Sequence, residues 1–87
     1  MKINLSEHAI LEMEQRRIDK KIVIEMIESP QQIIPSLKDR IIVQGKYQDA
    51  DLHKEMLLRI IGRKKRNNYF FVITVYKTSK IDKYWRT

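Results

Sequence analysis

The sequence contains no cysteine, which excludes disulfide bonds and thiolate metal sites. Its two histidines and scattered acidic residues form no cluster with metal-ligand spacing. No segment approaches the roughly 20 apolar residues of a membrane span, and the start, MKINLSEHAILEMEQ, has no apolar stretch long enough for a signal peptide. Repeats, low-complexity segments and domain linkers are also absent. We therefore expect one cytoplasmic domain over residues 1–87, with no metal or other cofactor and no membrane contact.

Acidic residues are scarce in the C-terminal half, and this scarcity locates the net charge of +7. Residues 1–44 balance seven Lys or Arg against seven Asp or Glu, whereas residues 56–87 hold nine cations and a single acid, Asp82. With 43% hydrophobic and 33% charged residues, the chain has the composition of a folded protein. A folded domain with one basic half and a pI near 9.8 is typical of a protein that binds nucleic acid or docks an acidic partner.

Two short helices are predicted ahead of any strand. Ser6 is a good N-cap for a helix over residues 7–16. Asp19 is a good N-cap for a second helix, which should end near Glu28 because Pro30 follows. Apolar residues recur at helical spacing in both segments and give each helix one buried stripe. The two helices therefore form an antiparallel pair with a very short joint.

Short β-type runs follow the helices. Strands are expected over residues 32–34, 40–45, 56–63 and 69–77, with a polar loop over residues 46–55. The heptapeptide GRKKRNN joins the last two strands, and its paired asparagines tolerate the positive φ of a tight reversal. The final segment, TSKIDKYWRT, fits a further strand, a short helix or a frayed end. The expected fold is α+β, with two N-terminal helices packed on a three- to four-stranded antiparallel sheet.

Period-two alternation divides the two strongest strands into faces. One face should pack against the helices because it collects only apolar side chains: Met56, Leu58, Ile60, Tyr69, Phe71, Ile73 and Val75. The other face mixes apolar side chains with Arg59, Thr74 and Tyr76. Such a mixture is unusual on a face that meets only solvent, so the mixed face is the predicted working surface.

Several pieces of the sequence resemble, in order, one known family: SEHA at 6–9, RRI at 16–18, LRII at 58–61 and ITVY at 73–76, with Val23, Pro30, Gly45 and Tyr47 between them. This is the 4258 family of domains of unknown function (DUF4258), and the likeness covers nearly the whole chain. The family looks like a relative of the RelE, ParE and BrnT toxins of toxin–antitoxin pairs. The resemblance implies a RelE-like fold. It also implies one of two activities: RelE-type members cleave messenger RNA on the ribosome through sheet-face Arg, Lys and Tyr residues, whereas ParE-type members act on DNA gyrase.

The RelE-type reaction implied by this resemblance needs proton-transfer groups and cations around the phosphorane, but no metal. His8 is the candidate base, since a position in the first helical turn disfavours the imidazolium. Arg59 is the candidate phosphate clamp, and Tyr76 is the candidate proton donor or base-stacking ring. The structural alternatives are a helix-to-sheet hydrogen bond for His8 and closure of the core for Tyr76. For Arg59 the alternative is an ion pair with Glu55 or with a helix acid.

The remaining cations of the C-terminal half are candidate nucleic-acid contacts. The hairpin contributes Arg63, Lys64, Lys65 and Arg66. The last strand and the tail contribute Lys77, Lys83, Tyr84 and Arg86. Basic and aromatic residues together suit single-stranded RNA. The alternatives are that the hairpin is only a solvated tip and that the tail aromatics, above all Trp85, pack on the sheet edge.

Three functions are compatible with these features. The first is an RNA endonuclease of toxin type, a metal-independent ribonuclease that acts on RNA, including ribosome-associated mRNA, and is neutralised by an acidic antitoxin protein. The second is a non-catalytic nucleic-acid-binding domain with the same cations. The third is a ParE-like toxin whose basic face docks a protein target. Cleavage products ending in a 2′,3′-cyclic phosphate would select the first.

Overall fold

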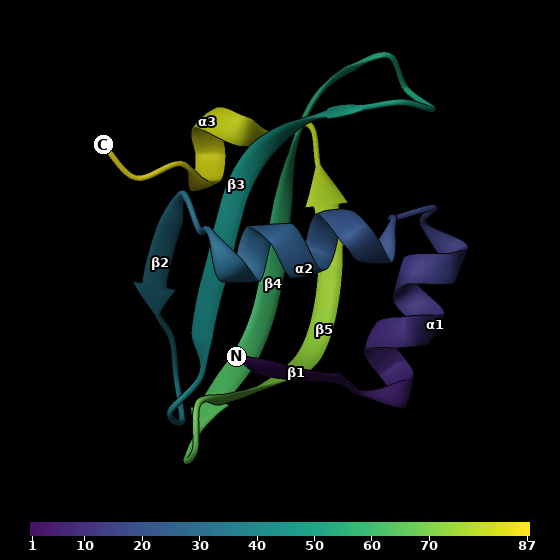
Figure 1. Cartoon of the computed structure of the whole chain (residues 1–87). Helices are drawn as coiled ribbons and strands as arrows, with labels where there is room; N and C mark the ends of the chain where they lie inside the picture. Colours follow the sequence, from purple (N-terminus) through teal and green to yellow (C-terminus); the bar gives the residue numbers. More distant parts are fainter.

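A computed structural model describes residues 1–87 and places three helices against one five-stranded sheet (Figure 1). The elements, in chain order, are β1 (Lys2–Leu5), α1 (Glu7–Gln15), α2 (Lys20–Glu28), β2 (Gln32–Pro35), β3 (Ile41–Asp49), β4 (Lys54–Lys65), β5 (Tyr69–Thr78) and α3 (Ile81–Tyr84). The strand order across the sheet is β1-β5-β4-β3-β2. The predicted α+β class and the two N-terminal helices are confirmed, but the helices do not form the predicted antiparallel pair, because α1 runs across the direction of α2 (Figure 1).

The sheet is mixed, because β1 runs parallel to β5 while the other pairs are antiparallel. The prediction of three or four antiparallel strands is therefore wrong in its count and for this edge. The four residues of β1 precede the first helix and are too few for a clear strand pattern. Within β1, Ile3 and Leu5 pack against the core while Lys2 and Asn4 are exposed, so the strand is fixed by its partner β5.

Both predicted N-caps are confirmed. Ser6 Oγ accepts a hydrogen bond from the backbone N–H of Ala9 at 2.9 Å, and the same hydroxyl donates to the carbonyl of Ile73 at 2.7 Å. This side chain therefore starts α1 and also ties the helix to β5. Asp19 caps α2 by accepting from the backbone N–H of Lys21 at 2.9 Å. The second helix ends at Glu28, as predicted.

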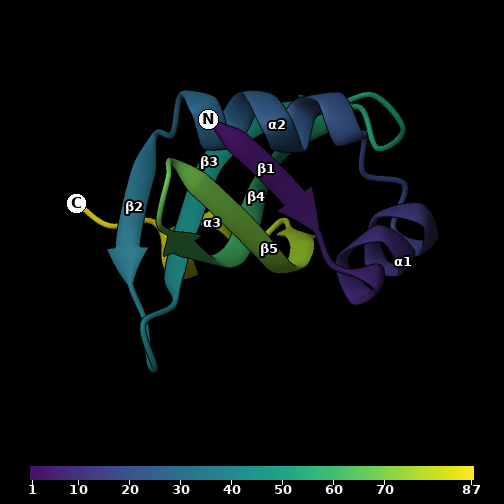
Figure 2. The same cartoon turned by 60° about the horizontal axis from the view of Figure 1, so that its bottom comes forward.

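One face of the sheet carries α1 and α2, and we call it the helix-bearing face. The core lies between them and consists of Ala9, Met13, Ile18, Val23, Met26, Ile27, Val43, Leu58, Ile60, Phe70, Val72 and Val75. Helix α2 crosses this face close to β3 (Figure 1), and a Cβ at Gly45 would overlap the Met26 side chain. A larger residue at this position would have to displace the flexible end of the Met26 side chain. Figure 2 shows α2 on one side of the sheet and α3 on the other.

The predicted faces of β5 are wrong for the first half of the strand. The register pairs Ile61 with Thr74 and Gly62 with Val72, so Ile73 has no opposite residue. This β-bulge inserts one residue into the alternation and reverses the faces on either side of it. Phe70 and Val72 are therefore buried under the helices, and Tyr69 and Phe71 lie on the opposite face. Only Val75 lies on the helix-bearing face as predicted.

The polar segment 46–55 is mostly strand, which contradicts the predicted loop. β3 continues to Asp49 and β4 begins at Lys54, so the connection is only residues 50–53. Asp49 is buried, and its carboxylate forms an ion pair with Lys77 from β5 at 2.7 Å. A charged residue is tolerated inside a strand when such a partner compensates it, and the partner lies 28 positions further along the chain.

The β4–β5 hairpin forms as predicted, but its connection is only residues 66–68, because β4 continues to Lys65 and includes most of the predicted GRKKRNN joint. Asn67 and Asn68 take φ values of 59° and 57°, and the preceding cations are exposed. The final segment forms the short helix α3, one of the three structures that the sequence allowed. No helix in the structure is long and apolar enough to cross a bilayer.

Candidate functional site

Four neighbouring strands each contribute one polar side chain to the sheet face opposite α1 and α2, which we call the outer face. Gln32, Gln44, Arg59 and Tyr76 lie directly beside one another on β2, β3, β4 and β5. We call this set the polar row. Direct cross-strand neighbours point to the same side of a sheet, so the register alone aligns the four side chains.

Hydrogen bonds link the polar row from end to end. Gln44 Nε2 donates to Gln32 Oε1 at 2.8 Å, and Gln44 Oε1 accepts from Arg59 Nε at 2.9 Å. Arg59 Nη1 donates to the hydroxyl of Tyr76. Gln44 is fully buried and Arg59 is only 9% exposed. The guanidinium is therefore held in one orientation by neighbours on both sides.

Arg59 has no carboxylate partner. The three ion pairs of the structure join Arg16 to Glu12, Arg17 to Asp51 and Lys77 to Asp49. The alternative that Arg59 pairs with Glu55 or with a helix acid is therefore wrong. Its neighbours are the neutral Gln44 and Tyr76 and the ring of Tyr84, whose centroid lies 4.2 Å from the Arg59 Cζ atom. A guanidinium removed from water and left unneutralised favours an anionic ligand, above all a phosphate or carboxylate that accepts two parallel hydrogen bonds.

The C-terminal tail, residues 79–87, lies over the polar row. Gln44 Nε2 donates to the carbonyl of Tyr84 at 3.0 Å. The Gln32 amide bonds to both main-chain groups of Arg86: its Oε1 accepts from the backbone N–H at 3.1 Å and its Nε2 donates to the carbonyl. Beyond the row, Lys46 Nζ lies 4.2 Å from the centroid of the Trp85 ring. The main chain of the tail therefore forms its hydrogen bonds with side chains of the polar row and not with the backbone of a neighbouring strand.

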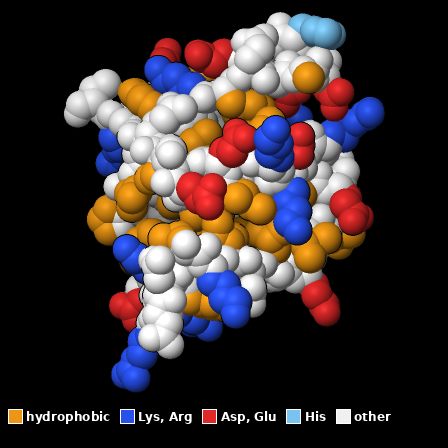
Figure 3. All heavy atoms as spheres, viewed as in Figure 1, with side chains coloured by type: hydrophobic (Ala, Val, Ile, Leu, Met, Phe, Trp, Pro, Cys, Tyr) orange, Lys and Arg blue, Asp and Glu red, His pale blue; other side chains and the backbone are white.

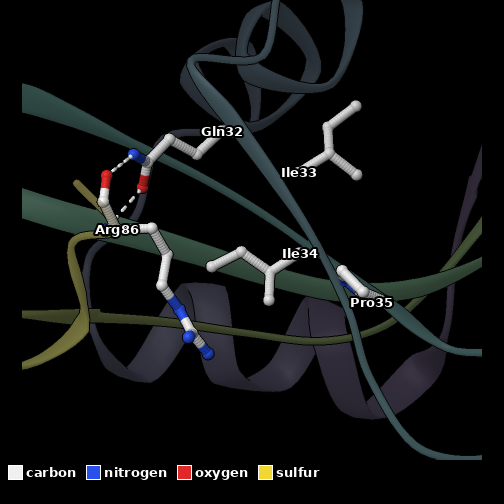
Figure 4. Close-up of a pocket in the computed structure, with 5 residues that line it drawn as sticks. All are labelled: Gln32, Ile33, Ile34, Pro35 and Arg86. Atoms are coloured by element: carbon white, nitrogen blue, oxygen red, sulfur yellow. Dashed lines mark hydrogen bonds between the residues drawn. The ribbon is translucent and has the colours of Figure 1, made fainter.

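A hollow of about 420 Å³ opens where the tail meets β2, and Gln32, Ile33, Ile34, Pro35 and Arg86 line it. Figure 4 shows the Gln32 amide facing the Arg86 main chain and the Arg86 side chain extending beside Ile34. The Arg86 guanidinium forms no ion pair. This end of the row therefore presents a second cation beside an open depression.

A strip of cations continues along β4 towards the hairpin. Arg63 and Lys65 share the outer face with Arg59, because the alternation of β4 is regular and Lys65 Nζ lies 5.1 Å from the centroid of the Phe71 ring. Both residues are exposed, as are Lys64 and Arg66. We call Arg59, Arg63 and Lys65 the basic strip.

The structure brings together some of the predicted site residues and separates others. Arg59, Tyr76 and Tyr84 are in contact, and Lys83 Nζ lies 5.3 Å from the centroid of the Tyr84 ring. His8 is in the first turn of α1, as expected, but it is exposed on a helix that packs on the other face and makes no hydrogen bond with a side chain of the row.

Lys77 also lies apart from the polar row. Its side chain is on the helix-bearing face, is only 11% exposed and donates to Asp49 Oδ2. Tyr47 OH donates to the same oxygen at 3.0 Å, while Asp49 Oδ1 accepts from the backbone N–H groups of Asp51 and Leu52, each at 3.0 Å. The hydrogen bond from Lys77 lowers the pKa of Asp49 to about 2, and burial raises the pKa of Tyr47. Lys77 is thus already neutralised by a buried carboxylate.

Sequence reasoning did not single out Gln32 and Gln44. An amide side chain carries no charge and has no characteristic spacing in a single strand. The only local signal is that Gln44 is a polar residue directly after the apolar segment IIV of the same strand. The strand register is what makes the two amides neighbours of Arg59.

The chain is thus a basic α+β domain with a mixed, open five-stranded sheet. A family model described as Domain of unknown function (DUF4258) matches residues 5–77, and the chain belongs to this family, as the sequence resemblance predicted. The matched residues include the polar row and the basic strip and end before the C-terminal tail. No curated protein and no solved structure matches the chain significantly. The relationship to the RelE, ParE and BrnT toxins stays a prediction.

Proposed function

We propose that the domain is a RelE-related toxin that binds single-stranded RNA on the outer face of the sheet and cleaves it without a metal. The observation that carries this proposal is the Arg59 guanidinium, which is nearly buried, held in a fixed orientation and free of any carboxylate. A cation kept in this state is arranged to receive an anion, and a phosphodiester is the anion that a basic strip and aromatic rings suit best.

The basic strip supports an extended backbone as the ligand. Side chains on one face of a strand repeat about every 6.6 Å, so Arg63 and Lys65 offer successive cations along a line that leads to Arg59. Phosphates lie at intervals along a single strand in the same manner. Such contacts carry no sequence information, so we expect low sequence preference in binding.

Cleavage would join the ribose 2′-oxygen to the adjacent phosphorus and release the 5′-oxygen of the next nucleotide, leaving a 2′,3′-cyclic phosphate. Arg59 would stabilise the charge of the phosphorane. Tyr76 accepts a hydrogen bond from Arg59, so its own hydroxyl proton is free to pass to the leaving 5′-oxygen. The 2′-hydroxyl proton would leave to water or to a base brought by the RNA-bound state.

A second candidate, RNA binding without cleavage, is favoured by one observation: no imidazole or carboxylate bonds to Arg59 or Tyr76. Without a positioned base the reaction loses a contribution of about 10²- to 10⁴-fold. Such a domain would hold RNA with the same cations and leave it intact.

The partner implied by the toxin proposal is an acidic antitoxin protein. Its carboxylates would meet Arg63, Lys64, Lys65 and Arg66, which are exposed and form no ion pair within the chain. Charge complementarity of this kind speeds association and is weakened by salt.

The test of RNA binding is a salt titration with a fluorescent single-stranded RNA of about 12 nucleotides. Replacing Arg63 and Lys65 by Gln should reduce the slope of log affinity against log salt by about 0.7 for each lost phosphate contact. The matched control replaces Lys20 and Lys21, two exposed cations of α2, and changes the net charge equally. An equal reduction in both variants would mean that only net charge matters, and would contradict a site on the outer face.

The test of cleavage is induced expression in a bacterium, with growth and RNA integrity measured together. Growth arrest with RNA fragments ending in a 2′,3′-cyclic phosphate supports the endonuclease. RNA binding without fragments supports the second candidate. Growth arrest with intact RNA and no RNA binding would transfer the function to a protein target, as in ParE-type toxins.

A further inference from the structure

The C-terminal tail occupies the place that an RNA ligand would take on the polar row. The Tyr84 ring covers one face of the Arg59 guanidinium, where a nucleobase would otherwise stack. The amides of Gln32 and Gln44 are bonded to the main chain of Arg86 and Tyr84. An anion therefore reaches the covered side of Arg59 only after the tail has moved.

The tail is fastened by contacts that are individually weak. Helix α3 has four residues and none of them is buried. Its polar attachments are amide hydrogen bonds and two cation–π contacts, Arg59 with Tyr84 and Lys46 with Trp85, and its apolar side chains are only half-buried. Segments with few fully buried apolar side chains open at a small fraction of the global unfolding free energy. The tail can therefore detach while the sheet stays folded.

We propose that residues 79–87 are an intramolecular cover that competes with RNA for the polar row. This inference rests on the proposed RNA binding and adds regulation to the same site. In the closed state the tail supplies an aromatic ring for Arg59 and main-chain partners for both glutamines, which are the types of contact that a base and a sugar-phosphate backbone offer. The apparent RNA affinity equals the intrinsic affinity reduced by the fraction of molecules that are open.

The test compares RNA affinity of the full-length protein with that of Tyr84→Ala, using the labelled single-stranded RNA at one salt concentration. Loss of the ring weakens the closed state only, so RNA should bind about three- to tenfold more tightly. The matched control is Ser79→Ala, an exposed tail position with no side-chain hydrogen bond, whose affinity should equal that of the wild type.

A second measurement uses Trp85, the single tryptophan of the chain, as a probe of the tail. In the closed state its ring contacts Lys46. Added RNA should shift the Trp85 emission to longer wavelength, with the same midpoint as the binding curve, and free Tyr84→Ala should already emit at the longer wavelength. A binding curve without any change in Trp85 emission would overturn the proposal.

The remaining outcomes separate the cover from the function beneath it. Weaker RNA binding by Tyr84→Ala would make the tail part of the RNA-binding surface, and unchanged binding would show that the tail does not compete; in both cases the cover is wrong and RNA binding stands. If neither protein binds RNA, the proposed function is wrong and the cover falls with it.

Discussion

Two buried cations, one on each face of the sheet, differ in how their charge is balanced. Lys77, on the helix-bearing face, is bonded to the Asp49 carboxylate at 2.7 Å. Arg59, on the outer face, is as deeply buried, yet its partners are an amide, a hydroxyl and an aromatic ring. The charge of a cation that is paired with a carboxylate is compensated within the protein. A cation with only neutral partners is uncompensated and still attracts an external anion. Burial alone therefore does not distinguish a structural charge from a functional one.

The surroundings of the two cations follow the same division. On the helix-bearing side, acidic and basic side chains are intermixed over the surface (Figure 3). On the outer face, Arg59 is followed along β4 by Arg63 and Lys65, with no acid in register. The helix-bearing face is covered by apolar residues, whereas the polar row on the outer face is covered by the polar contacts of the tail.

The largest expected effect is on RNA cleavage. Arg59→Met should lower the rate by about 10²- to 10³-fold, the range for removing one group that stabilises a transition-state charge. Lys77→Met should leave the rate per folded molecule unchanged, because Lys77 lies on the other face. The measurement is the initial rate of product formation, with the folded fraction of each variant determined by circular dichroism. Equal losses in the two variants would remove the distinction between the cations.

A comparison of Tyr76 with His8 sharpens the assignment of proton transfer. Tyr76→Phe should reduce cleavage by about 10²-fold, because its hydroxyl contacts Arg59. His8→Gln should reduce it far less, since His8 is exposed on α1. RNA affinity, measured in parallel, should change little for His8→Gln. A lower cleavage rate for His8→Gln than for Tyr76→Phe would mean that His8 takes part in the reaction and that α1 approaches the bound RNA.

The free energy of unfolding should show the opposite order from the cleavage rate, with the larger loss in Lys77→Met. Lys77→Met leaves the buried Asp49 carboxylate without its cation, and the free energy of unfolding should fall by about 3 kcal/mol. Arg59→Met should change it by less than about 1 kcal/mol, because the lost hydrogen bonds are offset by the end of guanidinium desolvation. Urea denaturation of both variants provides the comparison. A larger loss for Arg59→Met would make Arg59 mainly structural.

The smallest expected effect is the loss of stability at acidic pH that comes from Asp49. The pKa of Asp49 is lowered to about 2 in the folded protein, against an ordinary value of 3.8. The folded state therefore binds fewer protons between these values, and the contribution of Asp49 to stability is complete above pH 4 and lost as the pH falls through about 2. Wild type should be more stable than Asp49→Asn at pH 6, with a difference that shrinks towards pH 2. Thermal unfolding at pH 2, 3, 4 and 6 measures it, and a constant difference would mean that Asp49 is not ionised beside Lys77.

Local chemistry in the sequence determined the helices, the hairpin and the charge distribution. Ser6 and Asp19 act on backbone groups within three residues, and Asn67 and Asn68 need only their own φ. Arg59 and Tyr76 were also predicted on one face from the alternation within each strand, but the bulge at Ile73 is what makes them direct neighbours, because an unbroken register from the turn would place Val75 opposite Arg59. The family resemblance followed from the same short segments, and residues 5–77 match the family model.

Contacts between distant segments were decided only by the tertiary structure. The bulge at Ile73 reversed the faces of half a strand, and the parallel pairing of β1 depends on a partner more than 60 residues away. Likewise, the charge of Lys77 is compensated by Asp49, a residue of another strand. The polar row is covered by a tail that returns over β2 and β3. In each case a short polar or apolar segment has several partners of similar energy along the chain. The choice among them is made by register and burial, which local propensity does not encode.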